Sequence, residues 1–197
     1  IFGFVLIFTF GMIHGSNDLL IVNEILKKDK QYSNFKILLV YLLIVSFAIF
    51  IFYWTPILAL LLFVLFSAYH FGEQHWQHSF NNSNNKLKSL FYFCYGMLIL
   101  YLLFAFNNSG VIKIVFEITG QKLNNLYSLP ILIILGSCTG AFLFTELQNK
   151  RIGRETVLTE LFSLVVFAII FKSSSLIWGF TIYFILWHSM PSLVEQI

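Results

Sequence analysis

Long apolar segments, each close in length to the thickness of a bilayer, dominate this sequence. One runs from Pro56 to Ala68 and ends in a polar cluster, Tyr69–His78, which holds three histidines and a glutamate. Hydrophobic residues make up 58% of the 197 residues and charged residues only 11%, which is too little charge for a soluble domain of this length. A membrane-crossing helix needs about 20 apolar residues. The sequence therefore predicts an all-α, polytopic transmembrane helical bundle.

We expect about seven helices in a single integral membrane domain that covers residues 1–197. The predicted spans are residues 1–26, 35–54, 56–78, 87–106, 127–147, 155–171 and 176–189. A short interfacial helix is expected at residues 111–118, inside the longest connection. Because the chain begins within an apolar segment and ends just after a polar turn, we expect the native chain to have been truncated at its termini.

The basic residues predict how this bundle is oriented. Nine of the twelve Lys and Arg residues fall on the side of the membrane where the first span ends. Lys and Arg are enriched in cytoplasmic loops, so this side is expected to be cytoplasmic. The basic loops are thus a topology signal, and no nucleic-acid partner is expected. The loops that carry the nine residues are 27–36, 79–88 and 148–155.

Three of the predicted spans, which run in the same direction, contain histidine. His14, His70 and His188 lie at nearly one depth if each span rises about 1.5 Å per residue. Asp18 follows His14 by four residues and Glu73 follows His70 by three, so each carboxylate is expected on the same helix face as its histidine.

Two further polar residues are less regularly placed. Ser192 follows His188 by four residues, but Pro191 makes helical geometry there doubtful. His75 lies about 140° around the helix from His70 and points elsewhere unless Gly72 bends the chain.

A shared metal site is the interpretation that this layering favours. A single intramembrane histidine is most often a hydrogen-bonding strut between helices. Three histidines at one depth, each with a polar residue one turn away, favour a common site instead. Neutral imidazole suits Fe, Cu, Zn and Ni. The carboxylates of Asp18 and Glu73 could complete the ligand set, or hold the imidazole N–H groups in place.

The motifs that contain these histidines resemble a known family. His14-Gly15-Ser16-Asn17-Asp18, Tyr69-His70-Phe71-Gly72-Glu73 and Trp187-His188-Ser189-Met190-Pro191 are similar, in order and spacing, to motifs of the bacterio-opsin-related (Brp/Blh) membrane β-carotene 15,15′-dioxygenases. The resemblance implies an Fe(II)-dependent enzyme that cleaves β-carotene at its central double bond with O2 and yields retinal. It also implies a bacterial inner (plasma) membrane protein that is paired functionally with a retinylidene protein.

The resemblance assigns the iron to four histidines, of which His14, His70 and His188 match three. The fourth is expected four residues after His188, where this chain has Ser192. Asp18 and Glu73 are the substitutes best placed by helical angle, and His75 would serve if the chain bends.

Two alternatives remain open from the sequence. One is a proton- or ion-handling membrane transporter that uses Asp18, Glu73 and the histidines as a relay. Such bundles are often built from repeated halves, and we find no repeat in this sequence. The other is a family member that binds carotenoid or metal without cleaving, which Ser192 in place of a fourth histidine would favour.

Overall fold

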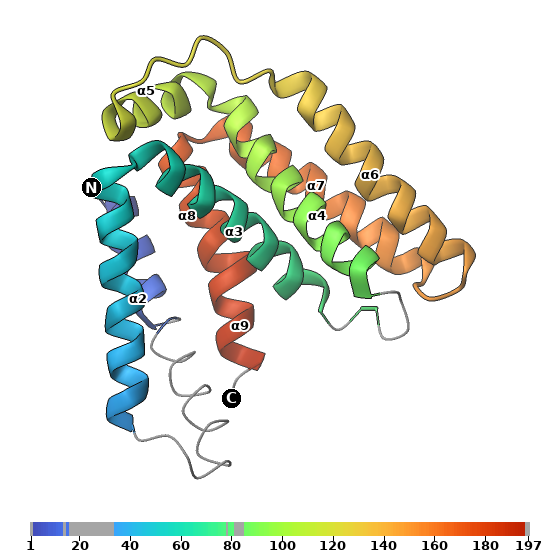
Figure 1. Cartoon of the computed structure of the whole chain (residues 1–197). Helices are drawn as coiled ribbons and strands as arrows, with labels where there is room; N and C mark the ends of the chain where they lie inside the picture. Colours follow the sequence, from blue (N-terminus) through green and yellow to red (C-terminus); the bar gives the residue numbers. More distant parts are fainter. Residues whose placement is uncertain (1, 14, 16–33, 78, 81–84, 196–197) are drawn as a thin grey trace.

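The computed structural model of the chain describes residues 2–13, 15, 34–77, 79–80 and 85–195, and the elements within these ranges are helical (Figure 1). His14, Asp18 and His78 lie outside the described residues. After an N-terminal helix at Phe2–Ile13, the helices are α2 (Asn34–Trp54), α3 (Pro56–Trp76), α4 (Asn85–Phe106), α5 (Asn108–Thr119), α6 (Ser128–Gln148), α7 (Arg154–Ser173), α8 (Leu176–Tyr183), a π-helix (Phe184–Ser189) and α9 (Met190–Glu195).

The prediction of an all-α membrane bundle is confirmed. Five described helical segments are long and apolar enough to cross a membrane, and they coincide with the last five predicted spans. Two shorter apolar helices, Phe2–Ile13 and Leu38–Trp54, fall in the first two predicted spans. The short helix expected within the longest connection is α5, which ends at Gly120 in the left-handed conformation that glycine accommodates.

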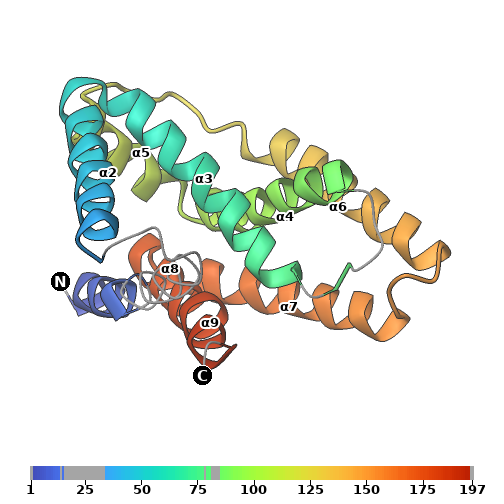
Figure 2. The ribbon, with the colours of Figure 1, turned by 60° about the horizontal axis from the view of Figure 1, so that its bottom comes forward.

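Helix α4 lies at the centre of the bundle, in contact with α3, α6, α7 and α8 (Figure 1). Two glycines bring α3 and α4 unusually close together. A Cβ added at Gly72 would overlap the carbonyl oxygen of Tyr92, and one added at Gly96 would overlap that of Ala68. Small residues allow helix backbones to approach in membranes, where packing replaces the hydrophobic driving force. Helix α2 lies at the edge of the bundle, where it contacts α3 and diverges from it beyond the turn that joins the two helices (Figures 1 and 2).

The N-terminal helix packs against α8 and the π-helix, and the two run in the same direction. Gly3 lies against Ile177 and Thr181, whose hydroxyl donates to the Gly3 carbonyl at 3.5 Å, and Gly11 lies against Phe184. Helix α3 runs in the same general direction as this last segment and crosses it obliquely (Figures 1 and 2). These directions agree with the sequence-based expectation that the three histidine-bearing spans run the same way.

The last helical segment differs from its prediction at its end. We expected it to stop at about Ser189, but the chain stays helical to Glu195 through Pro191. Proline removes one backbone donor and clashes with the carbonyl four residues earlier. Here the π-helix directly before it widens the turn, and the Met190 N–H donates to the carbonyl of Ile185, five residues back. The wider turn lets the helix continue where an α-helical turn would be disrupted.

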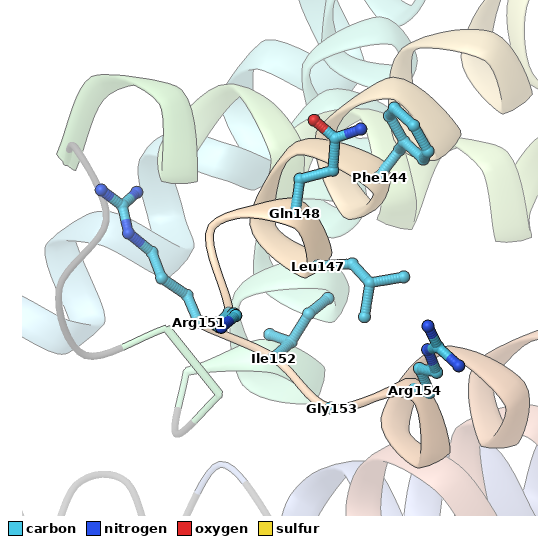
Figure 3. A pocket seen from close by; sticks show the side chains of 8 residues that line it. Phe144, Leu147, Gln148, Arg151, Ile152, Gly153 and Arg154 are labelled. Carbon is cyan, nitrogen blue, oxygen red and sulfur yellow. The ribbon is translucent and has the colours of Figure 1, made fainter.

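A tight turn joins α6 to α7 (Figure 3). The backbone N–H of Arg151 donates to the Glu146 carbonyl at 2.9 Å, and that of Lys150 donates to Leu147 at 3.1 Å. The Arg151 guanidinium also donates to the buried Glu146 carboxylate, at 3.1 Å. Ile152 is buried beneath the turn, so the connection is anchored by both polar and apolar contacts.

Candidate functional site

Two of the predicted histidines meet where α3 packs against the π-helix. The ring centroids of His70 and His188 are 4.9 Å apart and the rings are nearly perpendicular, at 80°. His188 is buried, with 3% of its surface exposed, whereas His70 lies on an exposed face of α3. The pair therefore joins the protein interior to the outer surface of the bundle.

The π-helix and one glutamine of α3 hold His188 in position. A π-helical turn shifts the side chains that follow it relative to an α-helix, and such turns are frequent at functional sites. His188 lies inside this turn, and its backbone carbonyl accepts a hydrogen bond from the Gln74 amide at 2.8 Å. The contact ties the two histidine-bearing segments together one turn beyond His70.

Aromatic rings surround the buried imidazole. The Phe71 ring centroid is 4.5 Å from that of His188, and the Phe184 centroid is 5.4 Å away. Phe71 also packs against Tyr183 at 5.6 Å and Phe180 at 6.3 Å. These rings form an apolar wall beside the histidine pair, which is the kind of lining that holds a rigid, apolar ligand.

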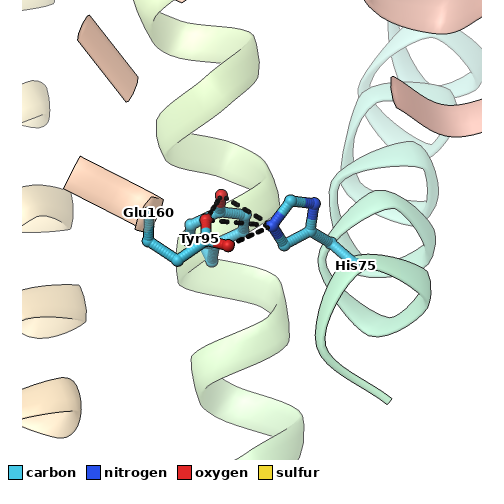
Figure 4. Close-up of polar contacts among 3 residues, drawn as sticks. All are labelled: His75, Tyr95 and Glu160. Atoms are coloured by element: carbon cyan, nitrogen blue, oxygen red, sulfur yellow. Dashed lines mark hydrogen bonds and ion pairs between the residues drawn. The ribbon is translucent and has the colours of Figure 1, made fainter. Parts of the chain in front are cut away.

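A second polar cluster joins three helices (Figure 4). His75 of α3 places Nε2 2.9 Å from both carboxylate oxygens of Glu160 on α7. Tyr95 of α4 donates its hydroxyl to Glu160 at 2.7 Å and lies 3.3 Å from the same histidine nitrogen. Because an ionised carboxylate only accepts hydrogen bonds, the arrangement favours the tautomer with hydrogen on Nε2.

The predicted site residues are thus divided between two places. His70 and His188 lie together, but His75 is turned away from His70, as its helical angle indicated, and contacts Glu160. Glu73 accepts a hydrogen bond from the Tyr69 hydroxyl at 3.0 Å. Ser192 is buried, with 6% of its surface exposed. His14 and Asp18, the remaining predicted site residues, fall outside the described ranges.

The histidine pair fits a transition metal in its donor chemistry, although it makes up only part of a ligand set. Within the described ranges, no three His, Cys, Asp or Glu side chains come together as a metal site would require. Two neutral imidazoles are donors that first-row transition metals accept. Two buried polar atoms near the pair, Gln74 Oε1 and Ser189 Oγ, have no hydrogen-bond partner among the residues that the structure describes. Buried polar atoms are normally satisfied, so these two are available to a polar ligand.

Glu160 is not among the site residues that the sequence predicted. The sequence does contain a signal for a role of Glu160: it is a carboxylate six residues inside an apolar helix, and such a group needs a partner at membrane depth. Its partners could not be found in the same way, since His75 and Tyr95 are contributed by different helices. The π-helix likewise carries no periodic signature that distinguishes it from an α-helix.

Together, the apolar helices and the paired histidines define an integral membrane protein of the all-helical class with an intramembrane histidine cluster. The model of the family described as beta-carotene 15,15′-dioxygenase matches residues 5–197, nearly the whole chain. The chain belongs to this family, which confirms the resemblance found in its histidine motifs. No curated protein and no solved structure matches the chain.

Proposed function

We propose that this protein cleaves β-carotene at its central double bond with O2, using iron, and releases retinal. Family membership supports carotene dioxygenation in general. The observation that carries the specific proposal is the contact between His70 and His188 beside an aromatic wall. This combination offers imidazole donors next to a surface suited to a long polyene.

His70 and His188 would hold the iron, with His14 as the third ligand. His75 is a further candidate only if it exchanges its contact with Glu160 for the metal. Asp18 and Glu73 would either fill the position that Ser192 leaves without a histidine or hold an imidazole N–H. When bound, Fe(II) with open coordination positions supplies the reactivity toward O2.

The protein's own contribution is to position the polyene and exclude water. Phe71, Phe180 and Phe184 form a rigid aromatic surface that orients a flat, apolar chain alongside the histidine pair. The same apolar surroundings keep water from the reacting bond. Carotenoids are dissolved in the bilayer, so the exposed face of α3 that carries His70 offers them a lateral route from lipid.

The apolar helices and the basic loops indicate the membrane setting. We propose a bacterial inner (plasma) membrane location, with the α6–α7 turn and the other basic loops in the cytoplasm. Retinal released into the same bilayer would reach a retinylidene protein, which we propose as the functional partner.

The network of His75, Tyr95 and Glu160 supports a second candidate, a proton- or ion-handling transporter. A buried intramembrane carboxylate with a histidine partner is characteristic of proton relays. This reading predicts pH-driven proton uptake into vesicles and no loss of carotene. The non-cleaving alternative predicts that carotene is bound but recovered intact.

Metal analysis and a cellular assay together test the proposal. Protein purified without added metal is expected to contain iron as its main transition metal. A bacterium that makes β-carotene is expected to lose carotene and accumulate retinal when it expresses the protein, and His70→Ala should abolish both changes. Carotene loss without retinal would indicate another cleaved bond. Unchanged carotene in cells supplied with iron would favour transport or binding.

A further inference from the structure

A cavity of about 640 Å³ opens at the α6–α7 turn, and neither His70 nor His188 is among its lining residues (Figure 3). Its lining combines apolar and basic groups and, among its residues, contains no carboxylate. The apolar part includes Phe144, Leu147 and Ile152, and the basic part is Lys150, Arg151 and Arg154. A cavity of this composition suits a ligand with an anionic head and an apolar body.

The three basic residues do not contribute equally. Arg151 is already paired with the buried Glu146, and Figure 3 shows its side chain extending to the far side of the turn from Arg154. Lys150 and Arg154 are both exposed, and neither forms an ion pair with any carboxylate that the structure describes. These two side chains are therefore the basic groups at the cavity that form no ion pair among the described residues, with the carboxylate of Glu155 next to Arg154 in the first turn of α7.

The cavity lies at the ends of two membrane-spanning helices, which places it at headgroup depth. Helix α6 ends at Gln148 and α7 begins at Arg154. Phe144, one turn before the end of α6, is 62% exposed, and Leu158, one turn into α7, is 65% exposed. Both apolar side chains face the surroundings of the bundle on the bilayer side of the turn. Acyl chains can pack against them while a phosphate group reaches the basic residues.

We propose that this cavity binds an anionic phospholipid, with its phosphate between Lys150 and Arg154 and an acyl chain along Phe144. The positive-inside rule alone accounts for the basic residues of the other loops. At the α6–α7 turn the cavity gives the basic residues a specific ligand as well, and binding of this ligand does not depend on carotene cleavage.

Titration with lipid tests the proposal on the full chain in detergent micelles, with native mass spectrometry as the readout. The probes are phosphatidylglycerol and phosphatidylcholine with the same acyl chains. Each basic residue near an anionic lipid is worth about fivefold in affinity, so phosphatidylglycerol should bind roughly 25-fold more tightly. The double variant Lys150→Gln/Arg154→Gln should bind the two lipids equally.

A second double variant controls for net charge. Lys113→Gln/Lys172→Gln removes the same charge from the side of the bundle that the positive-inside rule assigns to the outside. This variant should keep the preference for phosphatidylglycerol. Phe144→Ser should weaken binding of both lipids while keeping the preference. The circular dichroism spectrum of each variant should match that of the wild-type protein.

Three outcomes would overturn the proposal. Wild-type protein that binds both lipids equally has no anionic-lipid site. A preference that both double variants lose alike reflects net charge alone. If inorganic phosphate or glycerol 1-phosphate displaces phosphatidylglycerol at equal concentration, the cavity is a site for soluble anions and not for lipid.

Discussion

Replacing Glu160 with alanine should destabilise the bundle more than any other single carboxylate change within the described residues. The substitution removes the carboxylate that the Tyr95 hydroxyl and His75 Nε2 share as a hydrogen-bond acceptor, at 2.7 Å and 2.9 Å. The side chains of Glu160 and His75 are only 13% and 17% exposed, so water can replace little of the lost contact. Each buried group left unsatisfied costs about 1–3 kcal/mol, and breaking a buried pair costs about 3–5 kcal/mol. We therefore expect a loss of about 3–5 kcal/mol.

The assay is reversible unfolding in mixed micelles of SDS and a mild detergent, followed by circular dichroism. Glu160→Gln keeps one oxygen to accept from Tyr95 and should cost about 1–2 kcal/mol. Glu117→Ala is the matched control, because Glu117 pairs with Lys113 at 3.8 Å on an exposed helix surface and should contribute close to nothing. If Glu160→Ala unfolds at the same SDS fraction as Glu117→Ala, the network does not hold α3, α4 and α7 together.

Four further predictions follow from the packing and the site. Gly72→Ala should push α3 away from α4 and cost at least about 1–3 kcal/mol in the same unfolding assay, whereas Gly136→Ala, where an added Cβ meets nothing within 4 Å, should be neutral. His188→Ala should lower bound iron per protein at least tenfold without unfolding the chain, as judged by metal analysis; unchanged iron would remove His188 from the ligand set. Asp18→Asn should weaken iron binding about 10–100-fold if Asp18 supports a ligand, and unchanged metal content would mean that it serves another purpose. Cysteines introduced into loops 79–88 and 148–155 should react with impermeant reagents only from the cytoplasmic side, and labelling in intact cells would reverse the orientation.

The helices themselves were largely predictable from the sequence. Apolar runs of bilayer length bounded by Pro56 and by asparagine-rich or basic loops define α3, α4, α6 and α7 to within about two residues. Such boundaries are local properties, because every backbone group in a membrane must be satisfied within its own helix. The fixed rise per residue predicted one depth for the three histidines; His70 and His188 do lie together, and for His14, which lies outside the described residues, the common depth stays a prediction.

Contacts between helices could be predicted only in part. The helical angle correctly directed His75 away from His70, but it could not identify Glu160 and Tyr95 as the partners, because these lie on other helices. The prediction that the last helix ends near Ser189 was wrong for a related reason. Pro191 normally disrupts an α-helix, and only the preceding π-helical turn lets it be included.

Product stoichiometry in a purified system tests the central claim most directly. The protein in detergent, loaded with Fe(II) and given β-carotene and O2, should form two molecules of retinal for each carotene lost, since cleavage of the central bond gives two equal halves. His188→Ala treated identically should form none. If the iron-loaded protein leaves carotene unchanged, or if carotene disappears and products other than retinal accumulate, the proposed reaction at the His70–His188 site is contradicted.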